Sequence, residues 1–142
     1  MVKLIVSDLD DTLLADDLTI PAANVEAIAQ ARAQGLTFTL ATGRMFVSSL
    51  PYVRQLQLPE DVPLICYNGA VIRRINGDVV YDNLLPHELA MEIVKYCMDR
   101  GWTANVYYQD ELYVNEINPE VQYHTSVARV PAHEVGNLQE FL

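Results

Sequence analysis

The sequence predicts an α/β protein in which a parallel sheet with right-handed crossovers is followed by a mixed α+β half. Over residues 3–67, short runs rich in β-branched residues alternate with helical segments, as in parallel strands joined by crossover helices. Beyond residue 70 this alternation gives way to hairpins and single helices. With 142 residues, 51% of them apolar, the chain corresponds to about one globular domain of roughly 150 residues.

The parallel half is expected to contain three buried strands, at residues 3–7, 36–40 and 62–67. The first intervening helix should open at Pro21, with Thr19 or a neighbouring residue as its N-cap and Gly35 as its C-terminal stop. A second helix is predicted over residues 48–56, with Pro51 in or near its first turn.

The second half has a different pattern, which begins with the hairpin signal Asn76-Gly77 between strands at 71–75 and 78–82. An amphipathic helix is predicted from Pro86 to Arg100, with Leu89, Ile93 and Cys97 on its apolar face. The remaining expected elements are a hairpin of 103–108 with 111–114, a short helix after Pro119, and a turn and helix start in 130–142. We place a boundary near residues 83–85, which gives an N-terminal unit of 1–83 and a C-terminal unit of 84–142.

Composition restricts the partners and the location of the chain. The net charge of −10 repels nucleic acid and anionic membranes, so we expect neither as a partner. The short apolar runs predict no membrane span or signal peptide, and we therefore expect a cytoplasmic protein. Cys66 and Cys97 are expected to be buried thiols. The three histidines, His87, His124 and His133, lack metal-ligand spacing and are expected at the surface.

Polar motifs follow each of the three parallel strands, where ligands bind in open α/β sheets. They are Asp8-Leu9-Asp10, Thr42-Gly43-Arg44 and Asn68-Gly69. Each motif by itself also fits a purely structural role, in which the acids cap a loop and the other two motifs form turns. Asp11, Asp16 and Asp17 are interpreted as solvated loop charges. It is the convergence of three motifs at one sheet edge that favours a site.

The residue types in these motifs fit phosphoryl chemistry. A bound Mg²⁺ would take oxygen ligands from Asp8 and Asp10 and keep Asp8 ionised, and an ionised carboxylate is a nucleophile toward phosphorus. Asp10 could serve as general acid and then as general base. The Thr42 hydroxyl and the Gly43 N–H suit a phosphoryl oxygen, and Arg44 adds a positive charge. Asn68 could orient the phosphate or the nucleophile.

The same segments resemble the motifs of the haloacid dehalogenase (HAD) superfamily, in the form found in Cof-type phosphatases. Residues 8–14 (DLDDTLL) resemble its first motif, 40–44 (LATGR) its second, and 67–70 (YNGA) the segment before the cap. The resemblance implies a three-layer Rossmann-like core, of which 1–83 is the N-terminal part, and a cap with an α+β fold, of which 84–142 is a part.

The resemblance also implies roles by position. Asp8 would be the nucleophile and a Mg²⁺ ligand, and Asp10 the acid/base and a second ligand through its backbone carbonyl. Thr42 and Gly43 would hold the phosphoryl group, while Arg44 and the Asn68-Gly69 segment would support its pocket. The implied function is Mg²⁺-dependent hydrolysis of small phosphate monoesters, such as sugar phosphates, through an aspartyl-phosphate.

The chain departs from the family pattern in its second half. The family's later motifs carry a lysine and an acidic pair, whereas the only lysines here are Lys3 and Lys95. We therefore expect a truncated member with impaired activity, or alternatively a non-catalytic relative that binds metal, phosphate or a partner. A phospho-acceptor receiver domain is disfavoured, because Asn68 stands where a receiver needs an aspartate. The 3–7 strand would be an unpaired edge, so we also expect the chain to form a homodimer through that edge, to exchange elements with a second copy, or to be a fragment of a longer protein.

Overall fold

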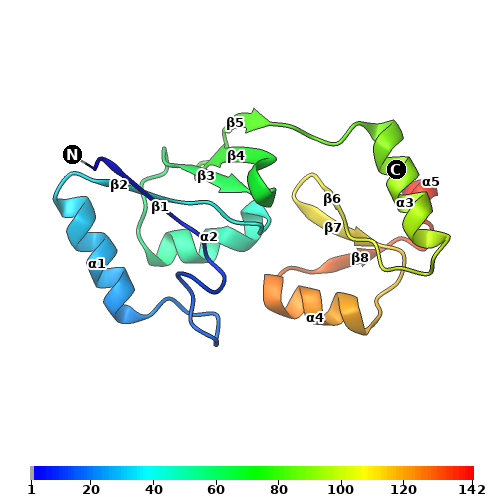
Figure 1. Ribbon diagram of the computed structural model, residues 1–142, viewed down its shortest axis with the longest axis horizontal. Coiled ribbons are helices and arrows are strands. Elements are labelled where there is room, and N and C mark those ends of the chain that lie inside the picture. Colours follow the sequence, from blue (N-terminus) through cyan, green and yellow to red (C-terminus); the bar gives the residue numbers. More distant parts are fainter. Residues whose placement is uncertain (1) are drawn as a thin grey trace. The chain divides into compact units, whose positions relative to one another are not determined.

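A computed structural model describes residues 2–142 and shows two compact units, with the boundary after Asn83 (Figure 1). The first unit contains five strands and two α-helices. The second contains three strands and three α-helices, one of them a single turn. Each unit has its own buried apolar residues.

In the first unit, each strand lies beside the strand that follows it in the chain. They are β1 (Leu4–Ser7), β2 (Thr37–Leu40), β3 (Pro63–Cys66), β4 (Val71–Arg74) and β5 (Val79–Asp82). β1 and β2 form a parallel pair in which Leu4 lies opposite Thr37. β3, β4 and β5 form an antiparallel meander, and the β4–β5 hairpin turns at Asn76-Gly77 as the sequence predicts.

The third predicted parallel strand is only loosely joined to the second. A single parallel bridge between Ala41 and Ile65 links β2 to β3. Next to it, the Thr39 hydroxyl donates to the Pro63 carbonyl. Pro63 has no N–H to donate to a ladder, which accounts in part for the interruption. The bridge is nevertheless sufficient to place the carboxyl end of β3 beside that of β2.

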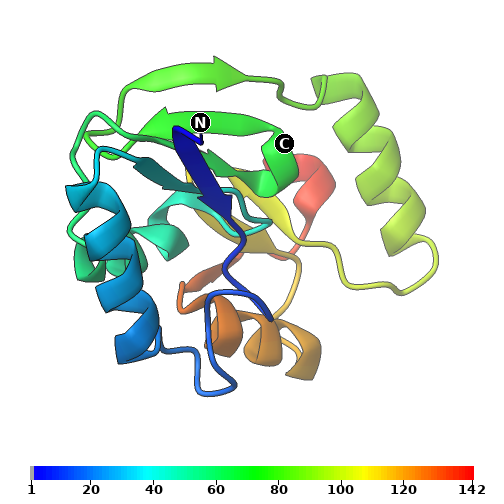
Figure 2. The same cartoon turned by 60° about the vertical axis from the view of Figure 1, so that its left-hand side comes forward.

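Two helices lie on the same side of these strands, as two successive right-handed crossovers require (Figures 1 and 2). They are α1 (Ala22–Ala33) and α2 (Phe46–Gln55). Thr19 is not the N-cap of α1, because Pro21 occupies that position and makes no side-chain hydrogen bond there; the Thr19 hydroxyl donates to Asp17. Gly35 follows the C-cap of α1 with a φ of 86°, as its predicted stop requires. α2 begins two residues earlier than predicted.

The core of the first unit forms between these helices and the strands. Its buried members include Ile28 from α1, Phe38 and Leu40 from β2, and Tyr52 and Val53 from α2. β1 alternates, so that Ile5 packs against this core, whereas Leu4 and Val6 are 51% and 46% exposed on the other face. Residues 2–83 thus provide the strand layer and one helix layer of an α/β core.

The second unit is built around a three-stranded sheet. Its elements are α3 (His87–Met98), β6 (Val106–Tyr108), β7 (Glu111–Val114), α4 (Pro119–Ala128), β8 (Ala132–Glu134) and α5 (Leu138–Phe141). β6 and β7 form the predicted hairpin, and β8 runs parallel to β7 after the α4 crossover. Asn118 caps α4 by accepting from the Val121 N–H at 2.9 Å.

Two details of this unit differ from the sequence prediction. Leu89 and Ile93 of α3 are 43% and 46% exposed, and the buried residue of the helix is Val94. The strand β8 falls within residues predicted as a turn and a helix start. Three residues are too few for an alternating pattern to be recognised, so only its pairing with β7 reveals it.

Both cysteines are free, with Cys66 buried and Cys97 half-buried. Among residues 2–142, no helix has the length and apolar composition that crossing a bilayer requires.

Candidate active site

Asp8 follows β1 directly, and its side chain is held by the neighbouring backbone. The Leu9 N–H donates to Asp8 Oδ1 at 2.7 Å. Within residues 2–142 the other carboxylate oxygen has no hydrogen-bond donor, and the residue is exposed. Asp8 therefore presents a fixed carboxylate with one oxygen open to a ligand.

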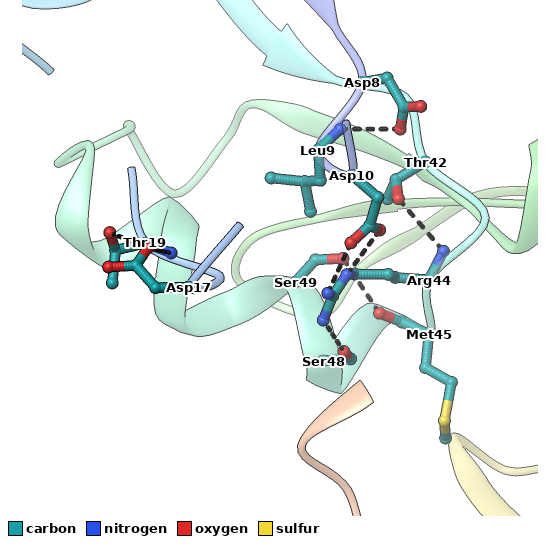
Figure 3. A network of polar contacts seen from close by, with 10 residues as sticks. All are labelled: Asp8, Leu9, Asp10, Asp17, Thr19, Thr42, Arg44, Met45, Ser48 and Ser49. Carbon is teal, nitrogen blue, oxygen red and sulfur yellow. Dashed lines mark hydrogen bonds and ion pairs between the residues drawn. The ribbon is translucent and has the colours of Figure 1, made fainter. Parts of the chain in front are cut away.

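Asp10 lies two residues further on and is bound by an arginine from the next strand end. Arg44 Nε donates to Asp10 Oδ2 at 2.8 Å, and Arg44 Nη2 donates to Asp10 Oδ1 at 2.7 Å (Figure 3). This bidentate geometry is the strongest form of arginine–carboxylate pairing. The pair joins the loop after β1 to the loop after β2.

Arg44 is itself held by α2. Its Nη1 lies 3.2 Å from Ser48 Oγ, and its guanidinium lies 5.4 Å from the centroid of the Tyr52 ring. The side chain of Arg44 is only 6% exposed, against 41% for Asp10. Sequence reasoning missed Ser48 and Tyr52. The signal was partial, since Ser48 and Tyr52 are four residues apart and share a helix face, whereas Arg44 precedes the helix.

The ion pair shifts the pKa values of both partners. The hydrogen bonds from Arg44 lower the pKa of Asp10, and they outweigh the partial burial that acts in the opposite direction. The hydrogen bond with Asp10 raises the pKa of Arg44, against the effect of burial; Asp8 contributes a smaller attraction. At neutral pH Asp10 is therefore an anion and Arg44 a cation.

The Thr42-Gly43 segment presents donors at the end of β2. Thr42 is 4% exposed, and its hydroxyl accepts from the Arg44 N–H at 3.2 Å, which leaves its proton to donate elsewhere. Gly43 is exposed, and its N–H has no acceptor within residues 2–142. A free backbone N–H at a strand end can donate to a bound anion, such as a phosphoryl oxygen.

The segment after β3 turns sharply next to Gly43. Tyr67, Asn68 and Gly69 have consecutive positive φ angles of 52°, 54° and 94°. The Tyr67 N–H donates to the Arg44 carbonyl at 3.0 Å, and the Asn68 N–H donates to the Thr42 carbonyl at 3.2 Å. Asparagine tolerates this left-handed conformation better than most residues. The turn thus places the Asn68 side chain against the backbone of Gly43.

The structure therefore brings together, on three loops at one end of the first unit, the residues that the sequence singled out. Asp8, Gly43 and Asn68 are exposed there, whereas the Arg44 guanidinium is engaged by Asp10 and Ser48. The Gly69 φ angle shapes the turn.

These residues suit a divalent cation in part. Asp8 offers an unengaged carboxylate oxygen, and the Asp10 carbonyl accepts no hydrogen bond from residues 2–142. Mg²⁺ binds oxygen ligands, keeps several waters and often uses only one or two carboxylates. In the described part of the chain no group of three or more His, Cys, Asp or Glu side chains could hold a metal. The donors present thus fit part of a Mg²⁺ shell.

The family model for haloacid dehalogenase-like hydrolases matches residues 5–139, and the chain belongs to this family. It is 30% identical over 125 residues to the 5-amino-6-(5-phospho-D-ribitylamino)uracil phosphatase YwtE of Bacillus subtilis, covering 88% of this chain and 42% of that protein. It is 33% identical over 106 residues to YitU, a phosphatase of the same name from that organism, covering 73% of this chain and 37% of the relative.

Solved structures agree with the fold. A haloacid dehalogenase-like hydrolase from Bacteroides thetaiotaomicron superimposes with a TM-score of 0.88 at 25% identity, over 99% of this chain and 54% of that one. The subclass IIB sugar phosphatase BT4131 superimposes with a TM-score of 0.76 at 23% identity, over 94% and 53%. The chain thus spans about half the length of the relatives it matches.

We expect Gly43→Ala to disturb the contact between the second and third loops. A Cβ on Gly43 would lie 2.9 Å from Asn68 Oδ1, so the Asn68 side chain would have to move. Gly43→Ala should lower the free energy of unfolding by about 1 kcal/mol, a magnitude typical of overpacking. Denaturant unfolding measures it. The double variant with Asn68→Gly removes the clash and should cost less than the two single changes added together; simple additivity would contradict the contact.

The Asp10–Arg44 pair predicts an asymmetry between its two truncations. Asp10→Ala leaves a buried cation without its partner and should lower the free energy of unfolding by about 2 kcal/mol, less than a fully buried pair costs, because Asp10 is partly solvated. Arg44→Met leaves Asp10 in contact with water and should cost about 1 kcal/mol or less. Urea unfolding of both variants tests whether Asp10→Ala lowers the free energy of unfolding more than Arg44→Met does.

The stabilisation of the fold by the Asp10–Arg44 ion pair should also depend on pH. Because the pKa of Asp10 is lowered in the folded state, the pair stabilises the protein above the ordinary pKa of an aspartate. The stabilisation is lost as the pH falls through the lowered value. The difference between wild type and Asp10→Ala should therefore shrink in acid, and a difference independent of pH would contradict the ion pair.

Proposed function

We propose that this chain carries the nucleophile half of a Mg²⁺-dependent phosphatase that hydrolyses small phosphate monoesters through an aspartyl-phosphate. One observation supports it most strongly: the open carboxylate of Asp8 and the unengaged N–H of Gly43 follow two hydrogen-bonded parallel strands. The phosphatase names of the Bacillus subtilis relatives support the reaction class. The sugar phosphatase among the structural neighbours makes sugar phosphates reasonable first substrates to test.

In the first step, an Asp8 carboxylate oxygen attacks phosphorus and the bond from phosphorus to the leaving oxygen breaks. The phosphoryl oxygens accept from the Gly43 N–H and the Thr42 hydroxyl, while Asn68 borders the pocket. Asp10, in its protonated form, gives its proton to the leaving oxygen. The incoming phosphate dianion favours that protonated form, because it repels the Asp10 carboxylate.

The second step regenerates the enzyme. Asp10, now a carboxylate, takes a proton from water as the water oxygen attacks phosphorus. The bond from phosphorus to the Asp8 oxygen then breaks, which releases inorganic phosphate and restores both groups. A Mg²⁺ held by the Asp8 carboxylate and the Asp10 carbonyl would supply positive charge beside the transferring phosphoryl group.

The two units are proposed to divide this work. Residues 1–83 form the N-terminal part of the catalytic core, and residues 84–142 form part of a cap that selects the leaving group. The two free thiols agree with a reducing environment, and we propose a cytoplasmic location.

A second candidate function is a non-catalytic relative that binds metal or phosphate, or a partner chain, without turnover. One observation favours it: the described residues contain no cluster of three acids or histidines to hold a metal firmly. Weaker metal binding and fewer positive charges near Asp8 reduce the stabilisation of the transition state.

Hydrolysis of p-nitrophenyl phosphate tests the proposed reaction. We expect turnover that requires Mg²⁺ and that Asp8→Asn abolishes, because the amide is not a nucleophile toward phosphorus. Asp11→Asn removes the same charge from an exposed loop position and is the matched control, with activity near that of wild type. A folded wild type without Mg²⁺-dependent turnover would favour the non-catalytic candidate.

We further propose that β1 pairs with a second copy of the chain. Among residues 2–142, β1 is hydrogen-bonded to β2 alone, and it exposes Leu4 and Val6. An unpaired apolar edge favours association, and a charged residue on it opposes association. Light scattering should show a concentration-dependent dimer that Val6→Lys weakens. Val79→Lys, at a similarly exposed valine of β5, is the control; a monomeric wild type would refute the dimer.

A further inference from the structure

We infer that Arg44 is a positioning residue for Asp10 and does not bind the substrate phosphate directly. This inference rests on the proposed function, since it assigns Arg44 a part in the protonation of the leaving group. It changes the expectation from the sequence, in which Arg44 supported the phosphate pocket.

The donors of Arg44 are largely committed inside the protein. Two of its N–H groups bind Asp10 at 2.7 and 2.8 Å, and a third nitrogen lies 3.2 Å from Ser48 Oγ. One face of the guanidinium lies over the Tyr52 ring, and the side chain is 6% exposed. A guanidinium has five N–H donors in a fixed plane. A phosphate that approached it directly would have to displace Asp10 or move α2.

The support runs from the scaffold to Arg44 and from Arg44 to Asp10. Arg44 is fixed by its backbone, whose N–H donates to Thr42 and whose carbonyl accepts from Tyr67, and by Ser48 on α2. Asp10 lies on the loop after β1, and its side chain is 41% exposed. An aspartate on such a loop would otherwise sample several rotamers. The bidentate contact selects one of them.

The contact leaves Asp10 able to exchange a proton. Each carboxylate oxygen has two lone pairs, and Arg44 uses one on each. The remaining lone pairs belong to the part of Asp10 that is exposed. Arg44 thus orients the Asp10 carboxyl group without occupying all of its acceptor positions. A lysine could supply the charge but not the two parallel hydrogen bonds.

The experiment compares two substrates that differ in their need for an acid. p-Nitrophenolate leaves without protonation, whereas the alkoxide of glycerol phosphate needs a proton from Asp10. The quantity measured is kcat/KM, which covers only the steps up to departure of the leaving group. We expect Arg44→Lys to lower kcat/KM for glycerol phosphate by at least about 10-fold more than for p-nitrophenyl phosphate, since general acids contribute roughly 10²–10⁴-fold.

A double variant separates positioning from direct binding. If Arg44 acts through Asp10, Arg44→Lys should cause less than about a two-fold further loss when Asp10 is already Asn, because coupled residues are not additive. Arg54→Lys, the same substitution at an exposed position of α2, is the matched control and should change neither substrate. Equal losses on both substrates, or multiplicative losses in the double variant, would overturn the inference.

Two further results keep the inference apart from the proposed function. The NMR signal of the Arg44 Nε–H should shift in Asp10→Asn without any substrate. An unchanged signal would overturn the bidentate contact between Arg44 and Asp10, whatever the activity. A wild type without Mg²⁺-dependent and Asp8-dependent turnover would overturn the proposed function and this inference together. Turnover in the wild type, together with equal losses of kcat/KM on the two substrates in Arg44→Lys, would overturn the inference alone.

Discussion

The parallel pairing of β1 with β2 is the constraint on which the site depends. Parallel strands end at the same edge of a sheet, so the loops that follow them meet there. Ser7 lies opposite Leu40 in this pair, and Asp8 and Thr42 follow at nearly the same height. The bridge from Ala41 to Ile65 then adds the loop after β3. Residues more than fifty positions apart in the chain are thereby collected at one edge.

The ion pair between Asp10 and Arg44 holds two of these loops together in an otherwise acidic protein. The net charge of −10 gives the chain little general attraction for a phosphate. Arg44 supplies a positive charge at the site, and that charge is largely neutralised by Asp10. Under the proposed function, attraction for a phosphate comes from the backbone N–H of Gly43, the Thr42 hydroxyl and a bound cation. Backbone donors suit this task because they are fixed by the fold.

Sequence patterns predicted elements well where local chemistry decides the structure. The Asn76-Gly77 turn formed as predicted, because its left-handed backbone suits glycine. Thr19 does not cap α1, because the helix begins after Pro21, two residues further along the chain. The exposure of Leu89 and Ile93 on α3 was missed, since periodicity shows that a helix has an apolar face but not how far that face is covered.

The sequence by itself determined the order of the elements, the polar residues at three strand ends and the resemblance to one hydrolase family, because these depend on local periodicity and on motifs. Only the tertiary structure decided what each polar residue does with its donors. Arg44 pairs with Asp10, which is 34 positions away in the chain. Asn68, in the loop after β3, packs against Gly43, in the loop after β2. Such contacts depend on strand pairing and helix placement, which bring together residues that no spacing in the sequence connects.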